Sequence, residues 1–151
     1  YAKTTYVNDI LHKISRELNK EEKFTDMLYN MLLMFCQELG IKTQILRSSQ
    51  LEVKGTKSDL IKNIVTFLDG KVYVSGKLGK NYLDSEDFHK EGIKIYFQDY
   101  KINRYTQQSK SFIPSLSIID VLMNLGWEET KNIILKNNLS KKELEDKYNG
   151  S

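Results

Sequence analysis

The fold is decided by residues 47–76, which read RSSQLEVKGTKSDLIKNIVTFLDGKVYVSG. Apolar residues recur at helical spacing over residues 57–68, which predicts a helix with one face on a sheet. Gly70 suits the end of that helix, and the β-branched and aromatic run at residues 71–74 predicts a strand that ends at Ser75 and Gly76. This succession is typical of half of a parallel α/β unit.

Outward from this stretch, the same periodicities predict a three-layer α/β fold whose short, mostly parallel strands are flanked by helices. Strands are expected near residues 41–46, 72–74 and 93–97. Helices are expected at residues 7–18, 25–39, 57–68, 117–125 and 127–137, and a short helix that begins at Asp84 or Ser85 is expected to run through Glu91. A capping box at Ser140 and Glu143 predicts a terminal helix. The expected buried stripes of the first two helices are Val7, Ile10, Leu11, Ile14 and Leu18, then Leu28, Met31, Leu32, Phe35 and Leu39.

Length and composition favour one soluble domain. A chain of 151 residues can bury roughly 70% of the surface that its unfolded form exposes. We therefore expect a single α/β domain over residues 1–138, followed by a terminal helix or tail over residues 139–151. No apolar run approaches the roughly 20 residues of a membrane span, so no membrane segment is predicted. Cys36 is the single cysteine, which excludes an internal disulfide and fits a reducing compartment such as the cytoplasm.

The net charge of +3 comes from lysines scattered among nearly as many acids, so it favours solubility over a nucleic-acid partner. A metal centre is not predicted either. His12 and His89 each lack a second histidine or cysteine at ligand spacing. We expect Cys36 to be a small buried hydrophobe, because no polar, thiolate-favouring neighbours accompany it. The sequence predicts no particular cofactor.

Candidate ligand-binding residues gather at predicted strand ends, because open parallel sheets bind ligands at their carboxyl edge. The residues concerned are Arg47, Ser48, Ser49, Ser75 and Gly76. Arginine suits bidentate binding of phosphate or carboxylate, and two of the three arginines, Arg47 and Arg104, lie at such an edge or in a long loop. A surface ion pair is the alternative for both. The expected ligand therefore carries a phosphate or a carboxylate.

Two glycine-containing segments offer further anion contacts. Thr56 and Lys57 follow Gly55 at a helix start, where free backbone N–H groups attract anions. The alternative is a capping box formed by Thr56 and Asp59, a pattern that recurs at Ser117 with Asp120, where we expect Asp120 to act as a helix cap. The spacing is not that of a Walker loop. The second segment contains Lys80, in a loop that follows Gly76 and also lacks the dinucleotide-binding glycine pattern.

Residues 98–115 show no periodic pattern, and irregular connections of that length are typical of binding loops or lids. Aromatic and guanidinium groups at Tyr100, Arg104, Tyr105 and Phe112 can stack on flat ligands. Asp99, at the exit of the last predicted strand, is the candidate catalytic base.

Several short motifs in one order are similar to those of a known family. They are Arg47-Ser48-Ser49-Gln50-Leu51, Gly55-Thr56-Lys57-Ser58-Asp59-Leu60, Tyr73-Val74-Ser75-Gly76, Tyr82-Leu83-Asp84, Gly92-Ile93, Phe97-Gln98-Asp99-Tyr100, Tyr105 with Gln107, and Phe112-Ile113-Pro114-Ser115-Leu116-Ser117-Ile118-Ile119-Asp120. On these residues the chain resembles the C-terminal part of the WbqC-like protein family, over about residues 1–126.

The resemblance implies a bacterial protein of cell-surface polysaccharide biosynthesis, such as that of O-antigen. Family members open with a His-Gln-Pro motif and an aromatic, proline-rich stretch that this sequence does not contain. We therefore expect the chain to be the C-terminal part of a larger family domain, holding part of its site. An exposed sheet edge left by missing strands would then favour self-association.

Three functions remain open from the sequence. The leading hypothesis is an enzyme or enzyme part that acts on an activated sugar or by acyl or aminoacyl transfer. The alternative is a non-catalytic module that binds a sugar, a nucleotide or a protein partner, since no nucleophile–base pair is legible. Nucleic-acid binding is the third hypothesis, and it requires lysines gathered on one face.

Overall fold

The computed structural model describes residues 1, 4–20, 23–136 and 138–149. The chain forms two compact units. The first, the helical unit, comprises Tyr1–Ile45 and Lys101–Asn138, and the second, the sheet unit, comprises Leu46–Tyr100 and Leu139–Ser151. The single domain expected over residues 1–138 stays a prediction. The units are described one at a time.

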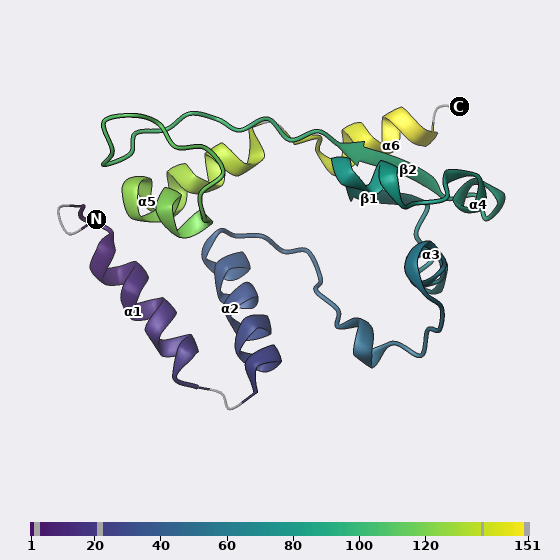
Figure 1. The fold of residues 1–151 in the computed structure, drawn as a ribbon, viewed down its shortest axis with the longest axis horizontal. Coiled ribbons are helices and arrows are strands. Elements are labelled where there is room, and N and C mark those ends of the chain that lie inside the picture. Colours follow the sequence, from purple (N-terminus) through teal and green to yellow (C-terminus); the bar gives the residue numbers. More distant parts are fainter. Residues whose placement is uncertain (2–3, 21–22, 137, 150–151) are drawn as a thin grey trace. The chain divides into compact units, whose positions relative to one another are not determined.

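Helices α1 (Val7–Leu18), α2 (Phe24–Glu38) and α5 (Ile118–Leu135) build the helical unit (Figure 1). Their core contains Ile10 and Leu122, which are both fully buried, together with Leu39 and Met123. Trp127 packs against this cluster, and its indole N–H donates to the Asp9 carboxylate of α1 at 2.9 Å. Apolar contacts and this bond therefore join α5 to α1.

Helix α5 is kinked at Gly126, the residue at which the sequence predicts one helix to end before another begins. Gly126 has φ 78° and ψ −179°, a conformation that favours glycine. A Cβ atom at this position would lie 2.6 Å from Cε1 of Tyr6, so the site also lacks room for a side chain. The buried Thr130 hydroxyl donates to the Gly126 carbonyl at 2.6 Å, which ties the second half of α5 to the residue at the kink.

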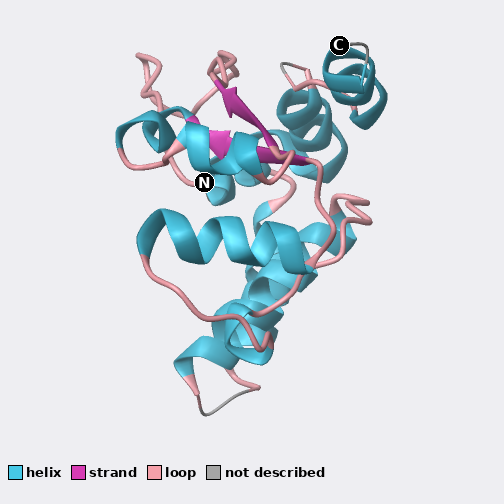
Figure 2. Cartoon of the chain, turned by 90° about the vertical axis from the view of Figure 1, so that its right-hand side faces the viewer, coloured by secondary structure: helices cyan, strands magenta, loops and turns pink. Residues whose placement is uncertain are grey.

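In the sheet unit, strand β1 (Val72–Gly76) pairs in parallel with strand β2 (Lys94–Gln98), and Figure 2 shows the two strands side by side. Helix α3 (Lys57–Phe67) precedes β1, while the 3₁₀ helix η2 (Lys77–Asn81) and helix α4 (Ser85–Lys90) connect the strands. Val65, Leu83, Phe88 and Ile93 form the core. The predicted α/β class, with a parallel short-stranded sheet flanked by helices, is confirmed.

The last helix, α6 (Lys141–Asn149), belongs to the sheet unit. The predicted capping box is confirmed, because the Ser140 amide donates to Glu143 Oε2 at 2.7 Å and the Glu143 amide donates to Ser140 Oγ at 3.2 Å. Tyr148 then sets its ring edge-on to Tyr96 of β2, with centroids 6.4 Å apart. None of the helices in the described ranges combines the length and apolar character that a membrane span needs.

The strand expected at residues 41–46 is wrong, and the described part of the sheet has two strands, not three or more. Alternating apolar residues predict a strand only where a partner supplies ladder hydrogen bonds. Here the Ile41 amide instead bonds to the Cys36 carbonyl at 2.8 Å, and the 3₁₀ helix η1 (Ser48–Gln50) follows. Arg47, Ser48 and Ser49 therefore do not lie at a strand end.

The buried stripes of α1 and α2 are narrower than the periodicity predicts. Leu11, Leu18, Leu28 and Leu32 were expected inside, yet each is 45–47% exposed. Met34, which lies off that stripe but is expected from the sequence to fill the core, is 5% exposed, so that expectation is confirmed. Cys36 is half-buried. Helical spacing identifies an apolar face, but the neighbouring helices decide which part of that face is covered.

Replacement of Phe88 should test the core of the sheet unit. This side chain is fully buried, and its ring centroid lies 5.7 Å from that of Tyr73 in β1. Phe88→Ala should lower the free energy of unfolding by about 3–5 kcal/mol, because it removes apolar contacts and leaves a cavity. The control Phe67→Ala, at a side chain that is 58% exposed, should change it by no more than about 0.5 kcal/mol in urea titrations. Equal losses would contradict this core.

Candidate functional site

The predicted site residues fall in both units. Arg104, Tyr105 and Phe112 belong to the helical unit. The others belong to the sheet unit, namely Arg47, Ser48, Ser49, Thr56, Lys57, Ser75, Gly76, Lys80 and Asp99. Ligand binding by either set stays a prediction.

At the carboxyl edge of the sheet, Gly76 of β1 lies opposite Gln98 of β2. The next residues along each strand, Lys77 and Asp99, form an ion pair with Nζ and Oδ1 3.4 Å apart. Their side chains are 70% and 52% exposed, so the pair contributes little to stability. Asp99, the predicted base, is therefore an accessible carboxylate held beside an ammonium group.

Ser75 and Lys80 have neighbours within the sheet unit. Ser75 is 4% exposed, and its hydroxyl donates to the Gly76 carbonyl at 3.2 Å. A Cβ atom on Gly79 would lie 2.0 Å from this hydroxyl, so the glycine makes room for it. The Lys80 ammonium lies over the Phe97 ring, 5.5 Å from its centroid. Gly79 is thus required for close packing against Ser75 of β1.

The start of α3 departs from a capping box. Thr56 makes no side-chain capping bond, whereas Gly55 at φ 135° and Lys57 at φ 51° take left-handed backbone conformations. Ser58 Oγ instead accepts a hydrogen bond from the Asp84 amide at 3.0 Å, and this bond ties α3 to the start of α4. The capping alternative for Thr56 and Asp59 is therefore wrong, and anion binding at this turn stays a prediction.

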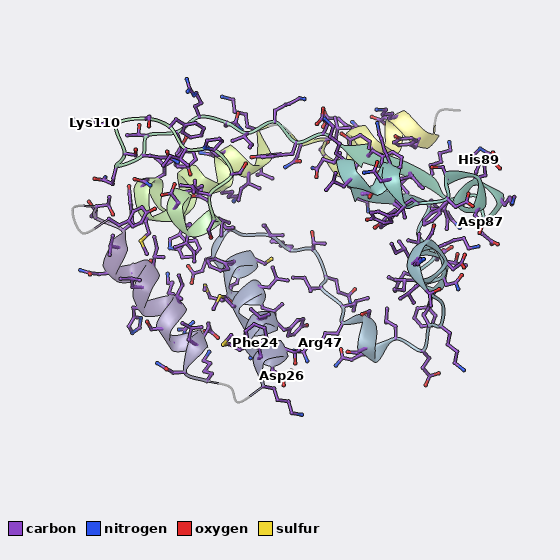
Figure 3. The ribbon with its side chains drawn as sticks, viewed as in Figure 1. Phe24, Asp26, Arg47, Asp87, His89 and Lys110 are labelled. Atoms are coloured by element: carbon purple, nitrogen blue, oxygen red, sulfur yellow. The ribbon has the colours of Figure 1, made fainter. Side chains whose placement is uncertain are left out.

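Charged side chains on α4 also have structural neighbours. The Lys62 ammonium contacts Asp87 Oδ2 at 2.6 Å, and this bond lowers the pKa of Asp87. His89 lies on the same helix as Asp87 and is exposed (Figure 3). In the described ranges, no group of three or more histidine, cysteine, aspartate or glutamate side chains is placed to bind a metal ion.

The most extensive polar cluster is in the helical unit, around the carboxylate of Asp120 on α5. Asp120 is 7% exposed. Its Oδ2 accepts hydrogen bonds from the Tyr105 hydroxyl at 2.5 Å and from Gln107 Nε2 at 3.1 Å. Its Oδ1 accepts from the Tyr1 hydroxyl and from Asn124 Nδ2, the latter at 3.3 Å. Four donors from three parts of the chain thus converge on one buried charge.

This arrangement fixes the charge of each member. Burial acts to raise the pKa of Asp120, but the hydrogen bonds that it accepts outweigh this effect, so its pKa lies below the ordinary value. The bond to Asp120 raises the pKa of Tyr1 to about 12. Burial, together with the same carboxylate, raises the pKa of Tyr105. At neutral pH the cluster therefore holds a carboxylate and two protonated phenols, which suits anchoring better than proton transfer.

The expectation that Asp120 is a helix cap is wrong. Ser117 does cap α5, since its Oγ accepts from the Ile119 amide at 3.2 Å. The carboxylate of Asp120, however, lies among the phenols and does not reach back to the cap, as a capping box requires. Tertiary donors compete successfully with the local bond.

Gln107 closes the long loop that the sequence predicts. Its amide oxygen accepts from the Ile113 amide at 2.8 Å, and its Nε2 donates to the Ile113 carbonyl at 2.9 Å. The Phe112 ring is edge-on to Tyr105 at 5.4 Å between centroids, and the Arg104 guanidinium lies 5.4 Å from its centroid. Three residues predicted to stack on a ligand therefore stack on one another. Lys110 lies at the far end of this loop (Figure 3).

A cavity of about 280 Å³ lies between the start of this loop and the second half of α5. It is lined by Asn103, Arg104, Tyr105, Thr106, Leu125, Glu129, Asn132, Ile133 and Lys136. In the described part of the chain, neither Arg104 nor Lys136 has a carboxylate within 4.0 Å. Glu129 is the one acidic lining residue, and it accepts a hydrogen bond from Asn132 Nδ2 at 3.2 Å. Two cations, amides and hydroxyls suit an anionic ligand rich in hydroxyl groups.

Sequence reasoning found part of this site. It named Arg104, Tyr105 and Phe112, but it missed Asn132 and Lys136, and it assigned Asp120 to the wrong role. The sequence signal for Asn132 and Lys136 is weak, because they are ordinary polar residues on an exposed face of a helix. Asp120 lies three residues after Ser117, and this spacing is that of a capping box, so the sequence alone favoured a role as a helix cap.

Replacement of Asp120 should test the cluster. Asp120→Asn should lower the free energy of unfolding by about 1.5–3 kcal/mol at pH 7, because it weakens bonds to a charged acceptor. Since the folded pKa lies below the ordinary 3.8, the carboxylate stabilises the fold above pH 3.8 and loses this effect as the pH falls through the folded value. The difference between the two proteins should therefore shrink below pH 3.8 in urea titrations.

The matched control is Asp146→Asn, at an exposed carboxylate of α6. It should change the free energy of unfolding by no more than about 0.5 kcal/mol. A loss for Asp120→Asn that is as small as that of the control would contradict the cluster.

Comparison with known proteins places the chain in a family. A model of the WbqC-like protein family matches residues 1–132. The chain is 33% identical over 112 residues to the uncharacterized protein Rv1507c of Mycobacterium tuberculosis, and the match covers 72% of this chain and 48% of that protein. The chain thus spans about half the length of this relative. No solved structure matches the chain.

Proposed function

The chain belongs to the WbqC-like protein family, and on that premise we propose that it is an enzyme or enzyme part of bacterial cell-surface polysaccharide biosynthesis, such as that of O-antigen. Its proposed role is that of a transferase, acting on an activated sugar or by acyl or aminoacyl transfer. The ligand carries a phosphate or a carboxylate, and the protein acts in the cytoplasm. The family resemblance supports the pathway, and the cavity of the helical unit supports the ligand class.

The observation that carries the proposal is the pair of cations on this cavity. Arg104 lies at the loop side, and Lys136 lies near the end of α5. A guanidinium and an ammonium that have no carboxylate within 4.0 Å among the described residues are available to an anionic group of a ligand. Asn132 and Thr106 add hydrogen-bonding groups for sugar hydroxyls. Activated sugars combine these two features.

The Asp120 cluster supports this cavity indirectly. Tyr105 both lines the cavity and donates to Asp120, and Gln107 holds the following loop segment. The proposed task of Asp120 is therefore positioning, because its carboxylate holds Tyr105 on the wall of the cavity. In this proposal Arg104 and Lys136 bind the anionic group, and Asn132 orients the remainder of the ligand.

A non-catalytic binding module is the second candidate function, and one observation favours it. The lining of the cavity contains no histidine, cysteine or serine that could form a nucleophile–base pair. Asp99, the predicted base, is not among the residues that line the cavity. The two functions predict the same binding residues, but only the enzyme turns its ligand over.

Binding should appear as thermal stabilisation in a scan against nucleotide sugars, sugar phosphates, nucleotides and aminoacyl or acyl donors. A ligand at 100 times its Kd stabilises the folded state by about 2.7 kcal/mol. The double variant Arg104→Gln/Lys136→Gln should weaken the binding of any stabilising ligand by about tenfold or more, because hydrogen bonds to charged groups contribute about 1.5–3 kcal/mol.

A matched double variant, Lys110→Gln/Lys142→Gln, also removes two positive charges, but at exposed positions outside the cavity. It should bind the ligand as the original chain does. Product formation from the stabilising ligand would distinguish the enzyme from the module. Equal binding by both double variants would remove the cavity as the binding site.

A further inference from the structure

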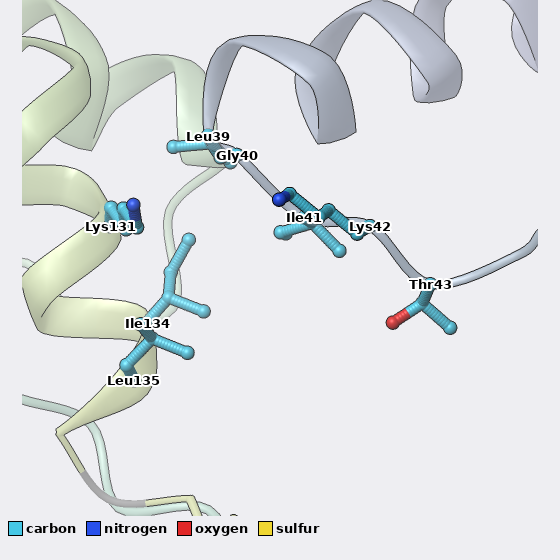
Figure 4. A pocket seen from close by; sticks show the side chains of 8 residues that line it. All are labelled: Leu39, Gly40, Ile41, Lys42, Thr43, Lys131, Ile134 and Leu135. Carbon is cyan, nitrogen blue, oxygen red and sulfur yellow. The ribbon is translucent and has the colours of Figure 1, made fainter.

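A second cavity, of about 190 Å³, lies on another part of the helical unit and plays no part in the proposed function (Figure 4). It is formed where the chain leaves α2 and passes the second half of α5. Its lining consists of Leu39, Gly40, Ile41, Lys42, Thr43, Lys131, Ile134 and Leu135. Apolar side chains dominate this lining, and the charged groups among them are both lysines.

The end of α2 produces this shape. The Gly40 amide bonds to the Gln37 carbonyl at 3.0 Å, and the Ile41 amide bonds to the Cys36 carbonyl at 2.8 Å. This pair of bonds, with Gly40 at φ 67°, is the Schellman ending of a helix. The sharp turn redirects residues 41–43 away from the helix axis, so that they form one wall of the pocket and α5 forms the other.

Two apolar groups of this pocket, Ile41 and Leu135, are left in contact with water. Leu39, at the helix end, is 3% exposed, but Ile41 is 37% exposed and Leu135 is 54% exposed. Exposed apolar groups around a concavity favour an apolar ligand, since its burial removes them from water. A cavity of about 150 Å³ accepts benzene, so this pocket has room for roughly six carbon atoms.

The two lysines of this pocket favour a ligand with a negative charge. In the described part of the chain, Lys42 and Lys131 have no carboxylate within 4.0 Å. Lys131 Nζ comes within 3.2 Å of the position that a Cβ atom on Gly40 would occupy, so the glycine leaves space for the ammonium at the α2 side of the pocket. In Figure 4 the amino groups of both lysines lie toward the end of α2, whereas Ile134 and Leu135 extend from α5.

We propose that this pocket binds a short aliphatic chain of about four to six carbons that ends in a carboxylate or a phosphate. The chain contacts Ile41, Ile134 and Leu135, and the anionic end lies between Lys42 and Lys131. Short-chain alkanoates and alkyl phosphates are the chemical classes that fit. This site is separate from the cavity of Arg104 and Lys136, so either proposal can fail while the other holds.

Ligand series in a nuclear magnetic resonance titration should test the proposal. Butanoate, pentanoate and hexanoate should bind with rising affinity, by about fourfold for each methylene that is buried. Hexanoate or hexyl phosphate should bind several-fold more tightly than hexanol, because only the anions pair with the lysines. The better of the two anions identifies the end group. Backbone signals of residues 39–43 and 131–135 should shift.

Charge variants separate this site from general attraction to a basic protein. Lys42→Gln/Lys131→Gln should weaken binding of the anions several-fold and leave the affinity for hexanol unchanged. The control Lys110→Gln/Lys142→Gln removes the same charge elsewhere and should leave all the affinities unchanged. Equal binding of hexanol and both anions, no dependence on chain length, or equal effects of the two double variants would overturn the proposal.

Discussion

The carboxylate of Asp120 governs the helical unit, because a charge removed from water has to be matched by hydrogen-bond donors. Tyr1, Tyr105, Gln107 and Asn124 supply them. Since Tyr105 and Gln107 belong to a loop without regular structure, the charge gives that loop a fixed attachment to α5. The aromatic and guanidinium stack at Phe112 then follows from the positions of its neighbours. A loop whose composition favours ligand contact is thereby ordered by the protein itself.

The two halves of helix α5, before and after Gly126, have different roles. Its first half carries Leu122 and Met123 into the core and Asp120 into the polar cluster. Its second half carries two separate faces. Glu129, Asn132, Ile133 and Lys136 follow helical spacing and line the polar cavity, whereas Lys131, Ile134 and Leu135 line the apolar one. One half of one helix thus offers two chemically different surfaces.

The described sheet of the sheet unit has two strands, and a two-stranded sheet is only marginally stable unless other elements pack against it. Phe88, Val65 and Ile93 provide this packing from helices α4 and α3 and from the turn before β2. The bond from the Asp84 amide to Ser58 Oγ and the pair of Lys62 with Asp87 hold the two helices together. Several polar residues of this unit that suggest ligand contacts, Ser58 and Ser75 among them, thus have structural roles.

Periodicity and capping determined the elements that depend on local interactions. Residues 7–18 were predicted as α1 with the observed bounds, both parallel strands were located, and Gly126, Asp84 and Ser140 mark boundaries that follow from backbone geometry and short-range hydrogen bonds. Tertiary structure alone decided what depends on distant partners. It left residues 41–46 without a strand to pair with, and it exposed Leu28 and Leu32. It also turned Asp120 from a local cap into the acceptor for residues up to 119 positions away. Spacing along a chain identifies which residues can share a face, but only packing decides what that face meets.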